Sequence, residues 1–156
     1  MKGDLEFVTL RPALAGLALL LALACSSLPM PVENEWARVT EARLDKSALD
    51  GAGFSVSYSF AIRPKRDDLD HVDIIDLSGS DPVTLISGAA VGGENAWTSE
   101  KVPLSAQSVP WLFTSGPTRK LFRFVLYTQS GETLSLEQPV FFSAETKAFY
   151  RRNVQP

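Results

Sequence analysis

The stretch that decides the fold is FSVSYSFAI, residues 54–62. Large apolar residues occupy every second position, namely Phe54, Val56, Tyr58, Phe60 and Ile62. The positions between them hold small residues, namely Ser55, Ser57, Ser59 and Ala61. Because successive side chains of a β-strand point to opposite faces, the pattern predicts a strand with its apolar face in a core and its small residues facing water. Gly53 and Pro64 bound this strand.

Similar segments lie on both sides of this strand. The sequence predicts further strands at 37–44, 71–77, 83–86, 97–104, 120–128 and 133–143, with loops at 87–96 and 105–117. Apolar residues on both faces of 120–128 indicate a strand near a sheet centre, and Ser130-Gly131 predicts a hairpin turn. Pro103 and Pro139 restrict their strands to sheet edges. About seven short strands predict an all-β protein with a single β-sandwich.

In layout, this part of the chain resembles immunoglobulin and fibronectin type III domains. The resemblance is architectural, because the chain has no cysteine pair around a tryptophan and no distinct tyrosine corner. It implies an immunoglobulin-like sandwich and no particular activity, since many domains share this architecture without sharing a function.

The N-terminal part contains an apolar run, ALAGLALLLALAC, residues 13–25. Its first twelve residues are all Ala, Leu or Gly. This is too short to cross a bilayer, which takes about 20 apolar residues, but it fits the apolar segment of a signal peptide. A buried core helix is the alternative, which the complete absence of a polar face disfavours. We therefore expect an N-terminal signal helix ahead of the sandwich.

The end of this run resembles the lipobox of bacterial lipoproteins. It reads Ala22-Leu23-Ala24-Cys25, with the leucine one place later than in the usual pattern. The resemblance implies cleavage before Cys25, a diacylglyceryl thioether on its sulfur and acylation of the new N-terminus; two or more chains give stable anchoring. The segment before the run is not basic, because Lys2 and Arg11 are offset by two acidic residues. An ordinary signal-peptidase site near Cys25 is the alternative.

These features predict four segments: a signal peptide (1–24), a lipidated tether (25–35), a sandwich domain (36–143) and a basic C-terminal tail (144–156). The tether is small, polar and rich in proline. By the lipoprotein resemblance, Ser26 as the second mature residue favours the outer membrane, on its periplasmic or surface face.

The composition of the expected mature chain narrows the function classes. It has 132 residues, with 13 Lys and Arg against 16 Asp and Glu, and so a formal net charge of −3. A mildly acidic chain disfavours nucleic acid as a partner. The full sequence has no second cysteine for a disulfide, and its one histidine and two methionines disfavour a transition-metal site. We expect no cofactor.

Acidic residues between 67 and 81 form the strongest candidate metal site. Asp67, Asp68 and Asp70 supply oxygen ligands of the kind that Ca²⁺ prefers. Their spacing matches no EF-hand loop, and a solvated turn neutralised by Lys65 and Arg66 is the commoner explanation.

Two acidic residues further along have an odd spacing. Asp73 and Asp76 are therefore expected on opposite faces of their strand. His71, the only histidine, lies beside carboxylates, but the chain carries no G-x-S-x-G nucleophile motif. We expect no catalytic role for it.

Three aromatic residues, Trp97, Trp111 and Phe113, are candidates for a contact surface toward a partner protein or glycan. Burial in the core is the commoner role of such residues. The sequence thus predicts a lipid-anchored cell-envelope protein that is not an enzyme and acts as a binding or structural module. The alternatives are a domain that binds carbohydrate or small ligands through exposed tryptophans, and a hydrolase that uses paired carboxylates.

Overall fold

The computed structural model describes residues 31–49, 53–91, 96–99, 102–104 and 110–152. Side chains are described for these ranges except at 46–49, 53–55 and 103–104. The expected signal helix and Cys25 lie outside the described residues. The compact unit that contains the sandwich starts at Pro31, five residues before the expected domain start at Trp36.

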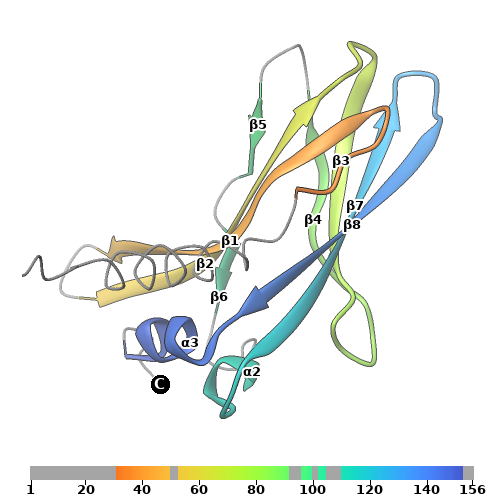
Figure 1. Cartoon of the computed structure of the whole chain (residues 1–156). Coiled ribbons are helices and arrows are strands. Elements are labelled where there is room, and N and C mark those ends of the chain that lie inside the picture. Colours follow the sequence, from red (N-terminus) through yellow and green to blue (C-terminus); the bar gives the residue numbers. More distant parts are fainter. Residues whose placement is uncertain (1–30, 50–52, 92–95, 100–101, 105–109, 153–156) are drawn as a thin grey trace, which may run out of the picture. The chain divides into compact units, whose positions relative to one another are not determined.

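Two antiparallel sheets form the sandwich (Figure 1). The first sheet contains β1 (Ala37–Leu49), β2 (Gly53–Pro64), β5 (Trp97–Thr98) and β6 (Val102–Leu104). The second has the order β4 (Val83–Ala90), β3 (Leu69–Asp76), β7 (Thr118–Thr128), β8 (Thr133–Phe142). Both β5 and β6 pair with β2, on the edge that β1 leaves free, and so fill one strand position. The prediction of an all-β sandwich with about seven strands is confirmed.

The apolar face of β2 lies in the core, as its alternation predicts. Val56, Tyr58, Phe60 and Ile62 are each at most 2% exposed, while the side chain of Phe54 lies outside the described part. Phe122 of β7 meets the rings of Tyr58 and Phe60 edge-on, with 5.1 Å between centroids in both pairs. Edge-to-face rings stabilise a core beyond the area they bury, so the two sheets are joined through these aromatic residues.

The opposite face of β2 does not face water, and this prediction is wrong. Ser57, Ser59 and Ala61 are 2%, 6% and 8% exposed. The reason is that β2 has strands on both sides, so longer cross-strand neighbours cover its small side chains. Ser59, for example, lies opposite Arg43 and donates to Glu41 Oε1 at 2.8 Å. Small residues in a central strand are covered in this way even on the outer side of a sheet.

The loop expected at 87–96 begins later than predicted. Strand β4 continues through Ser87 to Ala90, past an irregularity in its pairing with β3. Gly88 adopts φ +64° there, a left-handed conformation that glycine tolerates without steric cost. Its N–H donates to Asp73 Oδ1 at 2.6 Å. A glycine that seemed to end the strand instead allows a bulge within it.

The C-terminal hairpin follows the prediction. The inward residues of β7 and β8 are buried, and the turn at Ser130-Gly131 has Gly131 at φ +86°. Pro139 lies on β8, the last strand of its sheet. The short helix α2 (Pro110–Phe113) precedes β7 in the chain. It places Leu112 in the core with no exposed surface. Part of the loop expected at 105–117 is therefore a short helix with one core residue.

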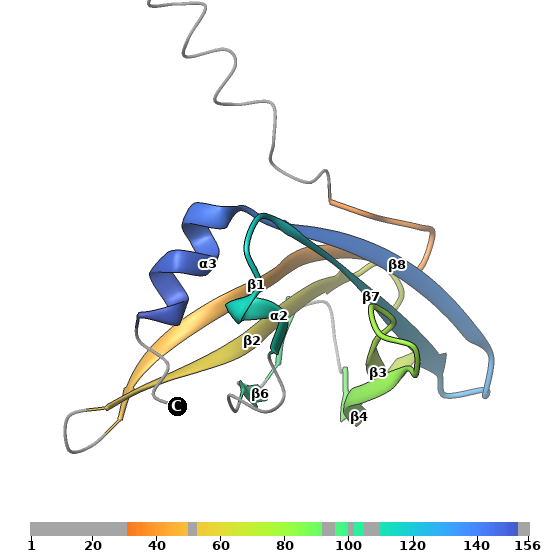
Figure 2. The same cartoon turned by 90° about the horizontal axis from the view of Figure 1, so that it is seen from below.

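A second helix, α3 (Ala144–Arg151), occupies the expected tail and lies beside β1 (Figure 2). Ser143 caps its N-terminus by accepting from the Thr146 N–H at 3.1 Å. The hydroxyl of Tyr150 donates to the Leu44 carbonyl of β1 at 2.8 Å. Lys147 has no exposed surface, and its ammonium donates to Thr114 Oγ1, Gly116 O and Thr118 Oγ1 at 2.8–2.9 Å. These contacts fix the helix to both sheets.

We expect Lys147→Met to lower the free energy of unfolding by about 1–3 kcal/mol, because it leaves buried oxygen acceptors without their donor. Amide hydrogen exchange should rise first in α3, which loses its attachment to the segment before β7. Chemical denaturation and exchange measurements test this. Arg119→Met is the matched control, because Arg119 is exposed, and it should change stability by less than about 0.5 kcal/mol. Equal effects of the two substitutions would contradict the role given to Lys147.

Candidate functional site

The first described residues are bound to the sandwich where the chain enters it. Asn34 Oδ1 accepts from the backbone N–H groups of Trp36 and Ala37 at 2.8 and 2.9 Å. The Val32 N–H donates to Gln138 Oε1 on β8 at 3.1 Å. The path of the chain is therefore set from Val32 onward, several residues before β1 begins.

Two basic residues after β2 hold this segment in place. Lys65 Nζ lies 2.9 Å from the Asn34 carbonyl and 3.1 Å from a Glu33 carboxylate oxygen. The guanidinium of Arg66 lies over the Trp36 ring, 4.7 Å from its centroid. The hydrogen bond from Lys65 lowers the pKa of Glu33.

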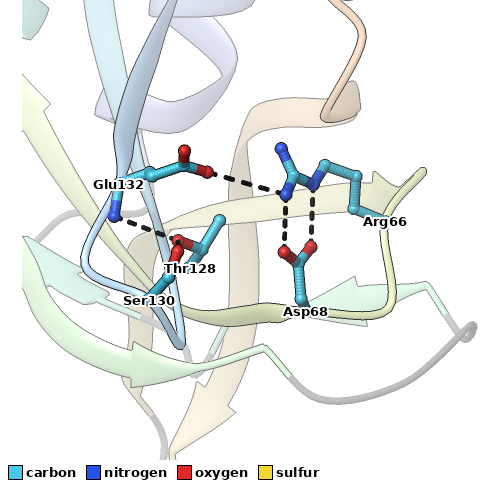
Figure 3. Close-up of polar contacts among 5 residues, drawn as sticks. All are labelled: Arg66, Asp68, Thr128, Ser130 and Glu132. Carbon is cyan, nitrogen blue, oxygen red and sulfur yellow. Dashed lines mark hydrogen bonds and ion pairs between the residues drawn. The ribbon is translucent and has the colours of Figure 1, made fainter.

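Arg66 also joins two turns at this end of the sandwich (Figure 3). Its Nε donates to Asp68 Oδ1 at 2.7 Å, its Nη2 donates to the other carboxylate oxygen, and Nη2 lies 3.7 Å from Glu132. This fork lowers the pKa of Asp68 and raises that of Arg66. The hairpin that carries Glu132 is held by Thr128 Oγ1, which contacts Ser130 and accepts from the Glu132 N–H. The arrangement positions backbone turns and offers no reactive group.

An ion pair lies on the inner face of the second sheet. Lys120 Nζ is 2.8 Å from Asp76 Oδ2, and the two side chains are only 11% and 12% exposed. Lys120 also lies 5.3 Å from the centroid of the Trp111 ring. Ser78 donates to the second oxygen of Asp76 from its hydroxyl and from its N–H. Burial raises the pKa of nearby Tyr58 strongly, and the Asp76 charge adds to the rise.

Asp73 lies on the opposite face from Asp76, as the odd spacing predicted. Its carboxylate accepts from the Tyr127 hydroxyl at 3.0 Å, which raises the pKa of Tyr127. The Tyr127 ring stacks on His71 with 4.2 Å between centroids and 12° between planes. The Nδ1 of His71 lies 2.8 Å from an Asp70 oxygen. Within the described residues, no hydroxyl or thiol is hydrogen-bonded to His71 as a nucleophile would be.

The three candidate calcium ligands are not gathered around one point. Asp68 is engaged by Arg66 and Asp70 by His71, while Asp67 is exposed. Across the described ranges, no group of three or more His, Cys, Asp or Glu side chains is placed to hold a metal ion. The predicted neutralisation is confirmed for Arg66, whereas Lys65 pairs with Glu33 instead.

The three candidate contact residues differ in exposure. Phe113 is 42% exposed, whereas Trp97 and Trp111 are half-buried against the core. The Trp111 ring also lies 5.0 Å from that of Phe142, and its Nε1 is buried without a hydrogen-bond partner. Of the three, Phe113 has the largest exposed fraction.

Sequence reasoning missed Lys120 and Lys147, the two most buried cations of the described part. A signal existed for Lys120, which shares the inward-facing register of Phe122, Phe124 and Leu126 on β7. An inward cation requires a partner, and Asp76 is the acidic residue on the neighbouring strand with inward register. No comparable pattern marks Lys147, because its acceptors come from a loop and a strand end about 30 residues earlier.

The fold defines the class of this protein as an all-β sandwich of two antiparallel sheets. No family model matches the chain, and neither curated proteins nor solved structures give a match. In the part that the structure describes, no helix is long and apolar enough to span a bilayer.

Proposed function

We propose that this chain is a lipid-anchored protein of the bacterial cell envelope whose sandwich serves as a non-catalytic binding or structural module. The observation that carries the proposal is the uncharged run Ala13–Ala24 followed directly by Cys25, the only cysteine. After cleavage, acyl chains on Cys25 would hold the protein at a membrane, because each buried methylene contributes about 0.8 kcal/mol.

The start of the sandwich supports this arrangement. Only five residues separate Cys25 from Pro31, where the compact unit begins. From Val32 onward the chain is held by Gln138, and Lys65 and Arg66 hold the next residues. A lipid anchor would therefore act on the sandwich through a short link at a defined point. By the resemblance to lipoproteins, Ser26 as the second mature residue favours the outer membrane as the site of the anchor.

The partner that fits the proposal is another envelope protein or a glycan, met at the sandwich surface. Sheet edges offer unpaired backbone groups to an incoming strand. In the described part β4 is such an edge, and it carries no charged side chain from Val83 to Ala90. Charged side chains are a common protection of edge strands.

The test is to express the wild type and Cys25→Ala in a bacterium and to compare intact mass and membrane fractionation. We expect a wild-type product that starts at Cys25, is heavier by its lipid groups and is recovered with membranes. The Cys25→Ala protein should remain uncut and carry no lipid. Ser26→Ala is the matched control, with wild-type processing. An unlipidated, soluble wild-type product would overturn the proposal.

A further inference from the structure

Two arginines lie directly opposite each other on the outer face of the first sheet. Arg38 of β1 pairs with Arg63 of β2, and both are exposed. The flanking pairs, Ala37 with Pro64 and Val39 with Ile62, are buried, so the arginines share the outward face. Cβ atoms of such a pair are about 4.5–5.5 Å apart, and like charges placed there are destabilising.

Among the described residues, neither arginine forms an ion pair, although Glu33 lies opposite Arg38 across a β-bridge and its charge attracts that arginine. No side-chain hydrogen bond joins either arginine to another described residue. The nearby acidic groups are engaged elsewhere: Glu41 bonds Arg43 and Ser59, and Glu33 bonds Lys65. Arg38 and Lys65 thus share one carboxylate, Glu33, and Arg63 has no ion pair there. The positive charge that remains can attract an external anion.

The position of the pair indicates which anion. Glu33 and Arg38 form a β-bridge, so the arginines lie beside the first residues of the compact unit. Six residue steps from Cys25 to Pro31 span at most about 20 Å. If Cys25 carries lipid, the pair stays close to the headgroups of the same membrane. Guanidinium groups match phosphate oxygens in geometry and charge.

We propose that Arg38 and Arg63 bind the phosphates of anionic lipids, so that the β1–β2 end of the first sheet docks on the membrane to which Cys25 is attached. This inference rests on the proposed lipid anchor. It adds an orientation to the anchor, since a lipid on Cys25 alone would leave the sandwich free to rotate about its link.

The test uses residues 26–156 as the common background, so that every variant lacks both the lipid and the apolar run before Cys25, while the compact unit from Pro31 onward is kept whole. Co-sedimentation is compared between vesicles of phosphatidylcholine alone and vesicles with one third phosphatidylglycerol. Adding Arg38→Gln and Arg63→Gln should lower binding to the anionic vesicles about 25-fold at low salt. Each charge near the surface contributes a factor of about five to the binding constant. Binding to neutral vesicles should not change, and the difference should shrink at high salt.

The matched control replaces Arg119 and Arg152, two exposed arginines on other elements, by glutamine. It removes the same charge and should change binding less than about twofold. Equal losses in both double variants would overturn the site, as would an unchanged preference for anionic vesicles in the Arg38/Arg63 variant. A melting temperature not below that of the background excludes misfolding, since the substitutions remove a repulsive pair.

A separate arm tests free phosphate as the source of the anion. Inorganic phosphate at 10 mM should not raise the melting temperature more in the background protein than in the Arg38/Arg63 variant. A rise that depends on these arginines, without vesicle binding, would assign the site to a soluble phosphate and overturn membrane docking. The lipid on Cys25 is tested separately by mass, so failure of the anchor and failure of the site are distinguishable.

Discussion

Lys120→Met is expected to lower the free energy of unfolding by about 3–5 kcal/mol. The substitution leaves Asp76 charged and nearly buried, 12% exposed, with only Ser78 to stabilise it. It also removes the cation that lies over the Trp111 ring. Since a domain of this size is stable by only about 5–15 kcal/mol, the variant should be marginally folded at 37 °C. Urea denaturation of both proteins measures the difference.

The control is Arg123→Met, which breaks the exposed Arg123–Glu137 pair on the outer face of the same sheet. It should cost about 1 kcal/mol or less, because exposed pairs contribute little. Adding Asp76→Asn to Lys120→Met should restore part of the lost stability, because it removes the uncompensated charge. A loss of less than 1 kcal/mol in Lys120→Met itself would show that the pair is solvated.

The same pair sets a pH dependence. Burial raises the pKa of Asp76, but the hydrogen bonds from Lys120 and Ser78 lower it by more, so the folded pKa lies below the ordinary value. The stability that Asp76 contributes is thus complete above the unfolded pKa of about 3.9 and is lost as the pH falls through the folded pKa. Denaturation of the wild type between pH 7 and 2 should show this loss at the acid end. In Lys120→Met the loss should be smaller.

Phe60→Ala is expected to lower the free energy of unfolding by about 3–5 kcal/mol. Phe60 has no exposed surface and meets Phe122 and Phe124 edge-on, with centroids 5.1 and 5.8 Å away. The substitution leaves a cavity between the sheets and removes both ring contacts. No second cysteine exists in the chain to form a disulfide that would offset the loss.

Phe141→Ala is the matched control for this prediction. Phe141 is 59% exposed on the outer face of β8, so its truncation should change stability by less than about 0.5 kcal/mol. The comparison is made by chemical denaturation under identical conditions. Similar midpoints for the two variants would contradict the placement of Phe60 at the centre of the core.

The strands that sequence analysis located best are those with a strong period of two. Alternation at Val56–Ile62 predicted which side chains face the core, because a strand's side chains alternate by geometry alone. Boundaries were less predictable: β4 runs on through Gly88, since a bulge satisfies the Gly88 N–H with Asp73. The burial of Ser57 and Ser59 also escaped prediction, because it depends on neighbouring strands.

The candidate functional groups also differ in whether one segment of sequence is enough to predict them. The apolar run before Cys25 is a local signal, because length and charge are properties of one segment. The link between Asp76 and Lys120 spans 44 residues, and the contacts of Lys147 span about 30. Pairing between Arg38 and Arg63 likewise depends on the register of β1 and β2.

The sequence by itself therefore determined an all-β sandwich, its principal core residues and the expectation of a lipid anchor at Cys25. Each of these follows from periodicity or composition within one segment. Only the tertiary structure decided that Lys120 and Lys147 are buried with their partners and that two exposed arginines lie opposite each other on one face. The physical reason is that solvation and pairing of a charge depend on strand register and sheet packing, which bring together residues far apart in the chain.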